Sequence, residues 1–431
     1  MIQRAWLKPL RNAGILAGGK LVHGVLSFIA LALAARTLGI DEFGLLALLH
    51  GLVMTLAQLA NFNSWQTVVR YGADALERLD RAGLRRILMF AFGLDLLAAA
   101  LAAVLILLFA VPVARLLGVP EELLPVARIY AFTALLLIGG NTGFGILRLL
   151  DRFDRLAIQN TSISLVRALG SLALFLTGGD LVGFLVVWAG AIALSRLLLY
   201  VFSAREIARR ALGAPWQGDW RVRLAPVAGI WRFAIGTHLI GTLRLTEARL
   251  GLLLVGALLG PAAAGLYRIA QQFADVVAQP IDKLLVPALL PELTRSAARG
   301  DTAGRRDLVL RPALASGAFA LFVLVVLGLF GRSLIALSVG PEFTDAWPVM
   351  MLLILAALPI AATFSLEPLL ISLGRLRATI LARIAASTLY IVLLVVLTNS
   401  LGLIGAGLAA LAYGILIATA LVPIAARAVR G

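Results

Sequence analysis

The chain has no cysteine and few histidines. It has 431 residues, of which only 3 are His and none is Cys. Without cysteine it cannot form a disulfide, use a thiol nucleophile or bind a metal through thiolates. The three histidines, His23, His50 and His238, do not have the spacing of a metal site. We therefore expect neither a metal nor a cofactor.

Common enzyme motifs are missing as well. The sequence contains no Walker A motif and no Gly-x-Ser-x-Gly nucleophile elbow, so ATP hydrolysis and hydrolase chemistry are not supported. The longest polar connections, 203–225 and 291–311, are too short to hold a catalytic domain. We expect the protein not to be an enzyme.

Charged residues are scarce, at 14% of the chain, whereas soluble domains carry about a quarter. Hydrophobic residues make up 61%, and the mean hydropathy is +1.00. Apolar runs of about 20 residues recur throughout and predict membrane-spanning helices, because lipid offers the backbone no hydrogen-bond partner. The predicted fold is an all-α polytopic membrane protein of about twelve spans. The spans are 13–35, 43–66, 87–113, 125–147, 156–176, 182–202, 226–257, 263–290, 312–331, 347–373, 379–397 and 403–425.

The formal net charge of +16 is unevenly distributed. Of the 38 Lys and Arg, 25 lie in segments on one side of the predicted spans, whereas only Arg36, Arg115 and Arg332 lie in the opposite loops. This positive-inside bias predicts that both termini are cytoplasmic, and it argues against nucleic acid as a partner. The basic start followed by an apolar run resembles a signal peptide, but we expect an uncleaved first helix.

An internal repeat occurs at an offset of 221 residues. Leu38-Gly39 followed by Gly44-Leu45 matches Leu259-Gly260 followed by Gly265-Leu266. Because each copy would enter from the same side, the repeat predicts two pseudo-symmetric six-helix lobes related by an axis along the membrane normal. The predicted lobes are 1–210 and 226–431, joined by a cytoplasmic linker at 211–225.

Polar residues form stripes at equivalent positions of the second and eighth predicted spans. Their spacing places each stripe on one helix face. Contact between such a polar face and lipid is energetically unfavourable, so the face should turn away from the lipid. The stripes predict a polar cavity. The alternative is a dry helix–helix interface that is stabilised by hydrogen bonds between polar side chains. The predicted cavity-lining residues are His50, Gln58, Asn61, Gln271, Asp275, Gln279 and Asp282.

Positive charges outnumber acids along the first, second, seventh and eighth spans. A cationic cavity within a membrane favours an anion, and arginine suits phosphate oxygens in particular. We therefore expect an amphiphile with a phosphate head group and a lipid tail. The predicted binding residues are Lys20, His23, Arg244, Arg249 and Arg268. The candidates for ion coupling are Glu247, Asp275 and Glu367.

Four segments in order resemble a known family. Residues 35–45 and 258–267 resemble the first outer turn of each half of the polysaccharide-biosynthesis (oligosaccharide/O-antigen) flippases. These belong to the multidrug/oligosaccharidyl-lipid/polysaccharide exporter superfamily. Residues 373–375 and 401–410 resemble the turn before its eleventh helix and the start of its last helix.

The resemblance implies two lobes that form a V around a central cavity and alternate between inward- and outward-open states. It also implies an undecaprenyl-diphosphate-linked oligosaccharide as substrate, moved from the cytoplasmic to the periplasmic leaflet of a bacterial inner membrane. The product would serve lipopolysaccharide, O-antigen or exopolysaccharide synthesis. Expected partners are this lipid-linked oligosaccharide, membrane lipids, and a polysaccharide polymerase or assembly proteins.

Three other functions compete with the flippase, and the sequence leaves the first and the third of them open. A cation-coupled multidrug antiporter would have the same architecture but would favour an acidic, aromatic-lined pocket. A membrane-embedded polymerase or glycosyltransferase would need a sizeable outer loop, and none is present. A non-transporting scaffold of a glycan-assembly complex has no need of cationic stripes in both halves.

Overall fold

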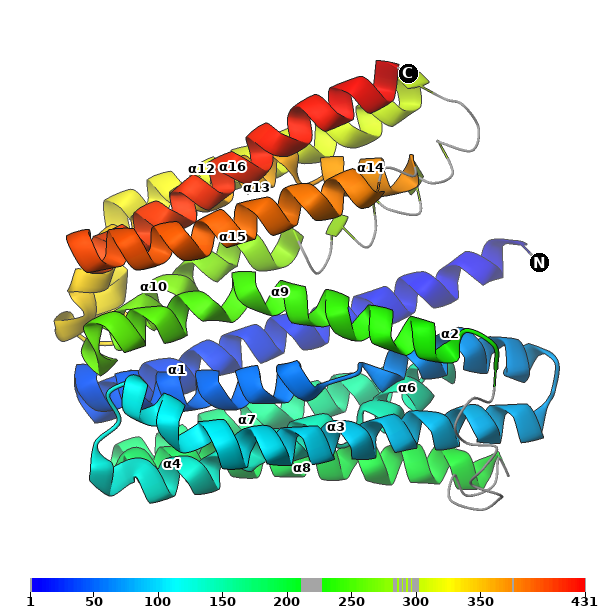
Figure 1. Ribbon diagram of the computed structural model, residues 1–431, viewed down its shortest axis with the longest axis horizontal. Helices are drawn as coiled ribbons and strands as arrows, with labels where there is room; N and C mark the ends of the chain where they lie inside the picture. The colour runs from blue at the N-terminus through cyan, green and yellow to red at the C-terminus, as the bar shows by residue number, and fades with distance from the viewer. Residues whose placement is uncertain are drawn as a thin grey trace. The chain divides into compact units, whose positions relative to one another are not determined.

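The computed structural model describes residues 2–210, 227–281, 285–286, 289, 292–293, 296, 302–373 and 376–430. Within these ranges, side chains are described except at 2–17, 19–21, 240, 243–248, 302–306, 371–372, 376–377 and 428–430. All regular structure in the described part is helical (Figure 1). The first eight α-helices are α1 Ile2–Ala60, α2 Ser64–Glu77, α3 Arg81–Leu116, α4 Leu124–Ala131, α5 Thr133–Ile138, α6 Asn141–Leu149, α7 Phe153–Thr177 and α8 Leu181–Arg209. The later ones are α9 Ile230–Leu259, α10 Pro261–Pro280, α12 Thr302–Ser338, α13 Trp347–Thr363, α14 Leu366–Ser372, α15 Leu376–Leu401 and α16 Leu403–Arg430.

The predicted all-helical membrane fold is confirmed. Nine helices in the described ranges are long and apolar enough to cross a membrane. One of them, 22–60, contains parts of two predicted spans, and the region after α10 lies partly outside the described residues. The number twelve therefore stays a prediction.

Three spans that were predicted as continuous are interrupted. The span 43–66 stops at Ala60 and restarts at Ser64, with Asn63 in a left-handed conformation (φ 50°) between the two helices. The span 125–147 is divided before α6, where Gly140 has φ 93°. The span 347–373 is divided between α13 and α14. An apolar run predicts that the chain crosses a membrane, but not that the helix is unbroken, because neighbouring polar groups can satisfy the freed backbone.

The chain folds into two compact units. Unit 1 comprises 1–38 and 48–249, and unit 2 comprises 39–47 and 250–431. The boundary lies inside α9, and a short piece of α1 packs with the C-terminal unit. The predicted lobe boundaries at 211–225 stay a prediction. In unit 1, α7 packs along α8, and in unit 2, α15 and α13 pack along α16 (Figure 1).

The two repeat glycines share one unusual backbone conformation. Gly39 has φ 68° and ψ −177°, and Gly260 has φ 87° and ψ 178°. Only glycine enters this region readily. Each residue ends one long helix segment and begins the next, so the sequence repeat corresponds to a repeated turn.

Next to these turns the two copies cross at close range within unit 2. A Cβ atom at Gly44 would lie 1.9 Å from the carbonyl oxygen of Pro261, and one at Gly265 would lie 2.8 Å from the carbonyl oxygen of Ile40. Because 40 and 261 are themselves equivalent at the 221 offset, the contact is reciprocal. Phe43 packs edge-on against Phe343 beside the crossing, with ring centroids 5.6 Å apart. Glycine is needed at both positions because the backbones touch.

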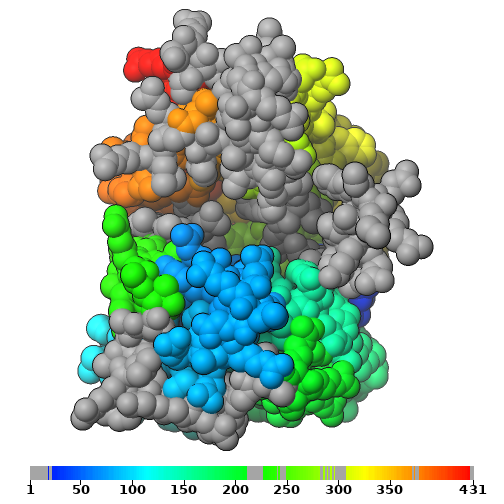
Figure 2. All heavy atoms as spheres, turned by 90° about the vertical axis from the view of Figure 1, so that its right-hand side faces the viewer, coloured from blue at the N-terminus to red at the C-terminus, as the bar shows by residue number. Residues whose placement is uncertain are grey.

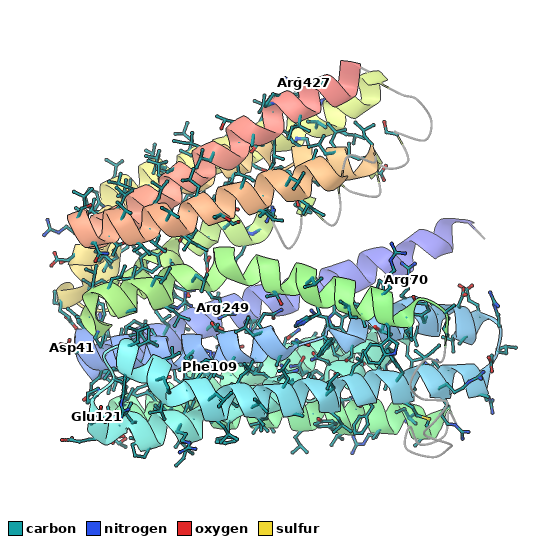
Figure 3. All side chains as sticks on the ribbon, in the orientation of Figure 1. Asp41, Arg70, Phe109, Glu121, Arg249 and Arg427 are labelled. Carbon is teal, nitrogen blue, oxygen red and sulfur yellow. The ribbon has the colours of Figure 1, made fainter. Side chains whose placement is uncertain are left out.

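Basic and acidic connections lie at opposite ends of each unit. In unit 1, Arg70 and Glu121 mark the two ends of the helices, and in unit 2, Arg427 and Asp41 do the same (Figure 3). Figure 2 views the basic end, where the turn between α2 and α3 is exposed in blue. This separation within each unit is what the positive-inside pattern predicts for helices that cross a membrane.

Candidate functional site

Four of the predicted site residues cannot be placed. The side chains of Lys20, Arg244 and Glu247 lie outside the described ones, although their backbones belong to α1 and α9. Asp282 lies outside the described residues. Their roles stay predictions.

His50 lies in a polar cluster formed by four helices of unit 1. Its Nδ1 is 2.9 Å from the hydroxyl of Tyr130, and its Nε2 is 3.3 Å from Nη2 of Arg167. The Arg167 guanidinium in turn lies over the Trp188 ring, 5.2 Å from its centroid. Because arginine only donates hydrogen bonds, Nε2 of His50 accepts and Nδ1 donates to Tyr130. Arg167 therefore holds His50 in one orientation.

Asn61 lies at the break between α1 and α2, where it is bonded on several sides. Its side-chain oxygen accepts from the backbone N–H of Asn63 at 2.8 Å and from Nδ2 of Asn141 at 3.0 Å. Its carbonyl oxygen accepts from Nδ1 of His238 at 2.9 Å, and the His238 ring stacks on Phe62. Asn61 therefore forms hydrogen bonds with both sides of the helix break and connects α9 to it.

Gln58 belongs to the same surface of unit 1. Its amide nitrogen would lie 3.0 Å from a Cβ atom at Gly241, so α9 approaches the stripe closely through a glycine. His23 binds elsewhere, with Nδ1 3.2 Å from the carbonyl oxygen of Asn160 on α7. Arg249, labelled in Figure 3, is exposed on α9 at the end of unit 1.

The stripe of α10 is largely satisfied along its own helix. Arg268 donates from Nη2 to the side-chain oxygen of Gln272 at 2.9 Å. One turn further, Gln279 donates to Asp275 at 3.0 Å. The charge of Asp275 acts on Arg268, as expected for one helix face. Gln271 of the same stripe hydrogen-bonds Tyr267, which is buried against Tyr390.

Glu367, a candidate for ion coupling, forms an ion pair. Its Oε2 lies 2.6 Å from Nη2 of Arg383, and the two side chains are 27% and 32% exposed. The sequence did not pair these residues, because one lies at the start of α14 and the other on α15. Ion coupling by Glu367 stays a prediction.

The structure also reveals a buried carboxylate that is not among the site residues predicted from sequence. Asp95 of α3 is 7% exposed and bonds to α2 and α6 at the two helix breaks of unit 1. Its partners Ser64 and Thr142 lie 31 and 47 residues away in the chain, so spacing alone gives no signal. The single sequence clue is a lone acid within an apolar span.

Comparisons with known proteins identify a family and a bacterial relative. The family model described as "Polysaccharide biosynthesis protein" matches residues 10–296. The inner membrane protein YghQ of Escherichia coli (strain K12) is 28% identical over 341 residues, which cover 79% of this chain and 95% of that protein.

Solved structures share the fold at low identity. An inward-facing multidrug resistance MATE family transporter of the MOP superfamily has a TM-score of 0.74 at 15% identity, with 96% of this chain and 94% of that chain covered. The lipid II flippase MurJ, in an inward closed conformation, has a TM-score of 0.73 at 11% identity, with 95% and 87% covered. The fold neighbours are thus transporters rather than enzymes.

Proposed function

Because the chain belongs to the polysaccharide biosynthesis protein family, we propose that it is a flippase for a lipid-linked oligosaccharide. It moves an undecaprenyl-diphosphate-linked glycan from the cytoplasmic to the periplasmic leaflet of a bacterial inner membrane by alternating access. Both termini are then cytoplasmic. The product serves the synthesis of a cell-surface polysaccharide or lipopolysaccharide, and a polymerase or assembly proteins act after it.

The excess of cations on polar helix faces is the observation that carries this proposal. Among the predicted site residues of these helices, four cations (Lys20, Arg244, Arg249 and Arg268) outnumber three acids (Glu247, Asp275 and Asp282), and the rest are amides and histidines. A diphosphate carries negative charge and several acceptor oxygens, which guanidinium and ammonium groups bind well. The lipid tail remains in the bilayer. In an antiporter for cationic drugs, acidic residues would outnumber basic residues in the cavity.

The experiment is transbilayer movement of a fluorescent undecaprenyl-diphosphate sugar in proteoliposomes, with Arg244→Glu compared to wild type. We expect the wild type to move the lipid. Charge reversal turns attraction of the diphosphate into repulsion, so we expect at least about a tenfold loss of rate, the equivalent of roughly 1.4 kcal/mol.

Arg81→Glu is the matched control. Arg81 is exposed at the first residue of α3, away from the predicted cavity, and an acidic residue is favourable at a helix N-terminus. It should transport as the wild type does. Equal rates in Arg244→Glu and the wild type would reject the cationic cavity. A folded wild type that moves no lipid would reject the flippase, and dye efflux would then test the antiporter.

A further inference from the structure

Asp95 lies where two interrupted helices of unit 1 restart. Its Oδ1 accepts a hydrogen bond from Oγ of Ser64 at 2.5 Å, and its Oδ2 accepts from the backbone N–H of Thr142 at 2.9 Å and from Thr142 Oγ1 at 2.8 Å. Ser64 is the first residue of α2, and Thr142 is the second of α6. One carboxylate therefore faces the N-termini of two half-helices, which carry partial positive charge.

Several titratable groups surround this carboxylate. Arg196 and Tyr200 of α8 act on its charge, and Nε of Arg196 is buried without a hydrogen-bond partner among the described residues. His238 of α9 is connected through Asn61, whose side chain accepts from Asn141 at the start of α6. The hydrogen bonds of Asp95 are made with Ser64 and Thr142, whereas Arg196 acts on the carboxylate through its charge.

The hydroxyl groups around Asp95 allow two protonation states without an unsatisfied atom. A hydroxyl donates one hydrogen bond and accepts others, and it can turn. Oγ of Ser64 and Oγ1 of Thr142 lie 3.5 Å apart. If Oδ1 binds a proton, it donates to Ser64, and Ser64 turns to donate to Thr142. Both bonds from Thr142 to Oδ2 stay in place.

We propose that Asp95 is a proton-binding site that couples the proposed flippase to the proton gradient. A proton from water binds Oδ1 and neutralises the carboxylate, and release of that proton restores the charge. The change in charge weakens or restores the attraction to the start of both α2 and α6. This inference rests on the proposed function, since a gradient has to drive some transport step. Intramembrane acids in other transporters form proton relays on the same physical grounds.

A metal cation fits this site less well than a proton. The oxygens of Asp95 are contacted by N–H and O–H donors at 2.5–2.9 Å, so hydrogens point at the lone pairs that a cation would need. In the described residues, no group of three or more His, Cys, Asp or Glu is arranged to hold a metal ion. The site therefore suits a proton, which binds directly to a carboxylate oxygen, better than a metal cation.

The first test is a pH titration of the purified full-length protein by infrared difference spectroscopy, without substrate. In the wild type, the carbonyl band of a protonated carboxyl group should disappear as the pH rises. This band should be missing in Asp95→Asn and present in Asp180→Asn. Asp180 is the matched control because it also accepts from a helix N-terminus, the N–H of Gly183 at 2.9 Å, but lies exposed at the opposite end of α8.

The second test is lipid distribution in proteoliposomes with an imposed pH difference. If one proton moves per lipid, one pH unit should shift the distribution by up to about tenfold in the wild type. Asp95→Asn should show no response to the gradient, whereas Asp180→Asn should respond as the wild type does.

Each other result overturns the inference. An Asp95 that stays ionised at every pH is a structural anchor only, and a carboxylate band that responds to sodium ions instead identifies a cation site. A titrating Asp95 together with transport that ignores the gradient rejects the coupling. If the wild type moves no lipid at all, the flippase fails, while the infrared titration still decides whether Asp95 binds a proton.

Discussion

Gly44→Leu should abolish the close crossing of the two repeats and with it the transport cycle. The first side-chain atom would meet the Pro261 carbonyl oxygen at 1.9 Å, where no rotamer helps. Overpacking of this kind costs about 3 kcal/mol or more. That corresponds to roughly a hundredfold fewer molecules in the observed arrangement. We expect lipid movement to fall by a similar factor.

Cysteine labelling can follow the crossing directly, because the chain has no cysteine of its own. Phe343 is fully buried against Phe43 beside the crossing. The cysteine of a Phe343→Cys variant should react slowly with a thiol reagent in an otherwise native chain. It should react faster when Gly44→Leu is added. Gly93→Leu is the control, since nothing lies within 4 Å of a Cβ atom there. Unchanged labelling and transport in Gly44→Leu would contradict the role of the crossing.

Glu206→Ala should give the largest loss of stability at the basic end of unit 1. Glu206 is 4% exposed near the end of α8 and binds Nη1 of Arg152, with Arg210 at 3.7 Å and Arg209 at 4.0 Å. Arg152 also bonds Asp154, and this hydrogen bond raises the pKa of Arg152, so its charge persists. Removal of Glu206 takes one of two carboxylate partners from a partly buried cation.

We expect the free energy of unfolding to fall by about 2 kcal/mol, since Arg152 keeps some contact with water and with Asp154. Thermal unfolding in detergent or in nanodiscs would measure the change. Asp74→Ala breaks a comparable pair with Arg78, but its side chains are 73% and 77% exposed. Exposed pairs contribute little, so this control should change stability by less than about 0.5 kcal/mol. Equal losses in both variants would show that burial of Glu206 is unimportant.

Much of the fold was predictable because its signals are local. Apolar runs located the helices, and the Leu-Gly repeat located the turns at Gly39 and Gly260. The helix breaks were missed, although Asn61-Phe62-Asn63 and Gly139-Gly140 are breaker residues that could have indicated them. In a window of strongly apolar residues these signals were outweighed by mean hydropathy.

The candidate site was less predictable because its contacts are distant in sequence. The stripe periodicity predicted polar residues on helix faces, but it could not pair His50 with Arg167 or Glu367 with Arg383. Asp95 illustrates the limit most clearly. Its partners come from helices that approach it only after folding, so its hydrogen bonds have no counterpart in local spacing.

The reciprocal glycine contact also limits how the two halves can evolve. The atoms that exclude a side chain at Gly44 and Gly265 are main-chain carbonyls, which every amino acid carries. No second mutation in the opposite copy can therefore make room, unlike a clash between two side chains. The intervening residues show the contrast, since Ile40-Asp41-Glu42 in one copy stands opposite Pro261-Ala262-Ala263 in the other. These neighbours differ between the two copies, whereas both glycines are the same, as expected where only a missing side chain avoids the main-chain clash.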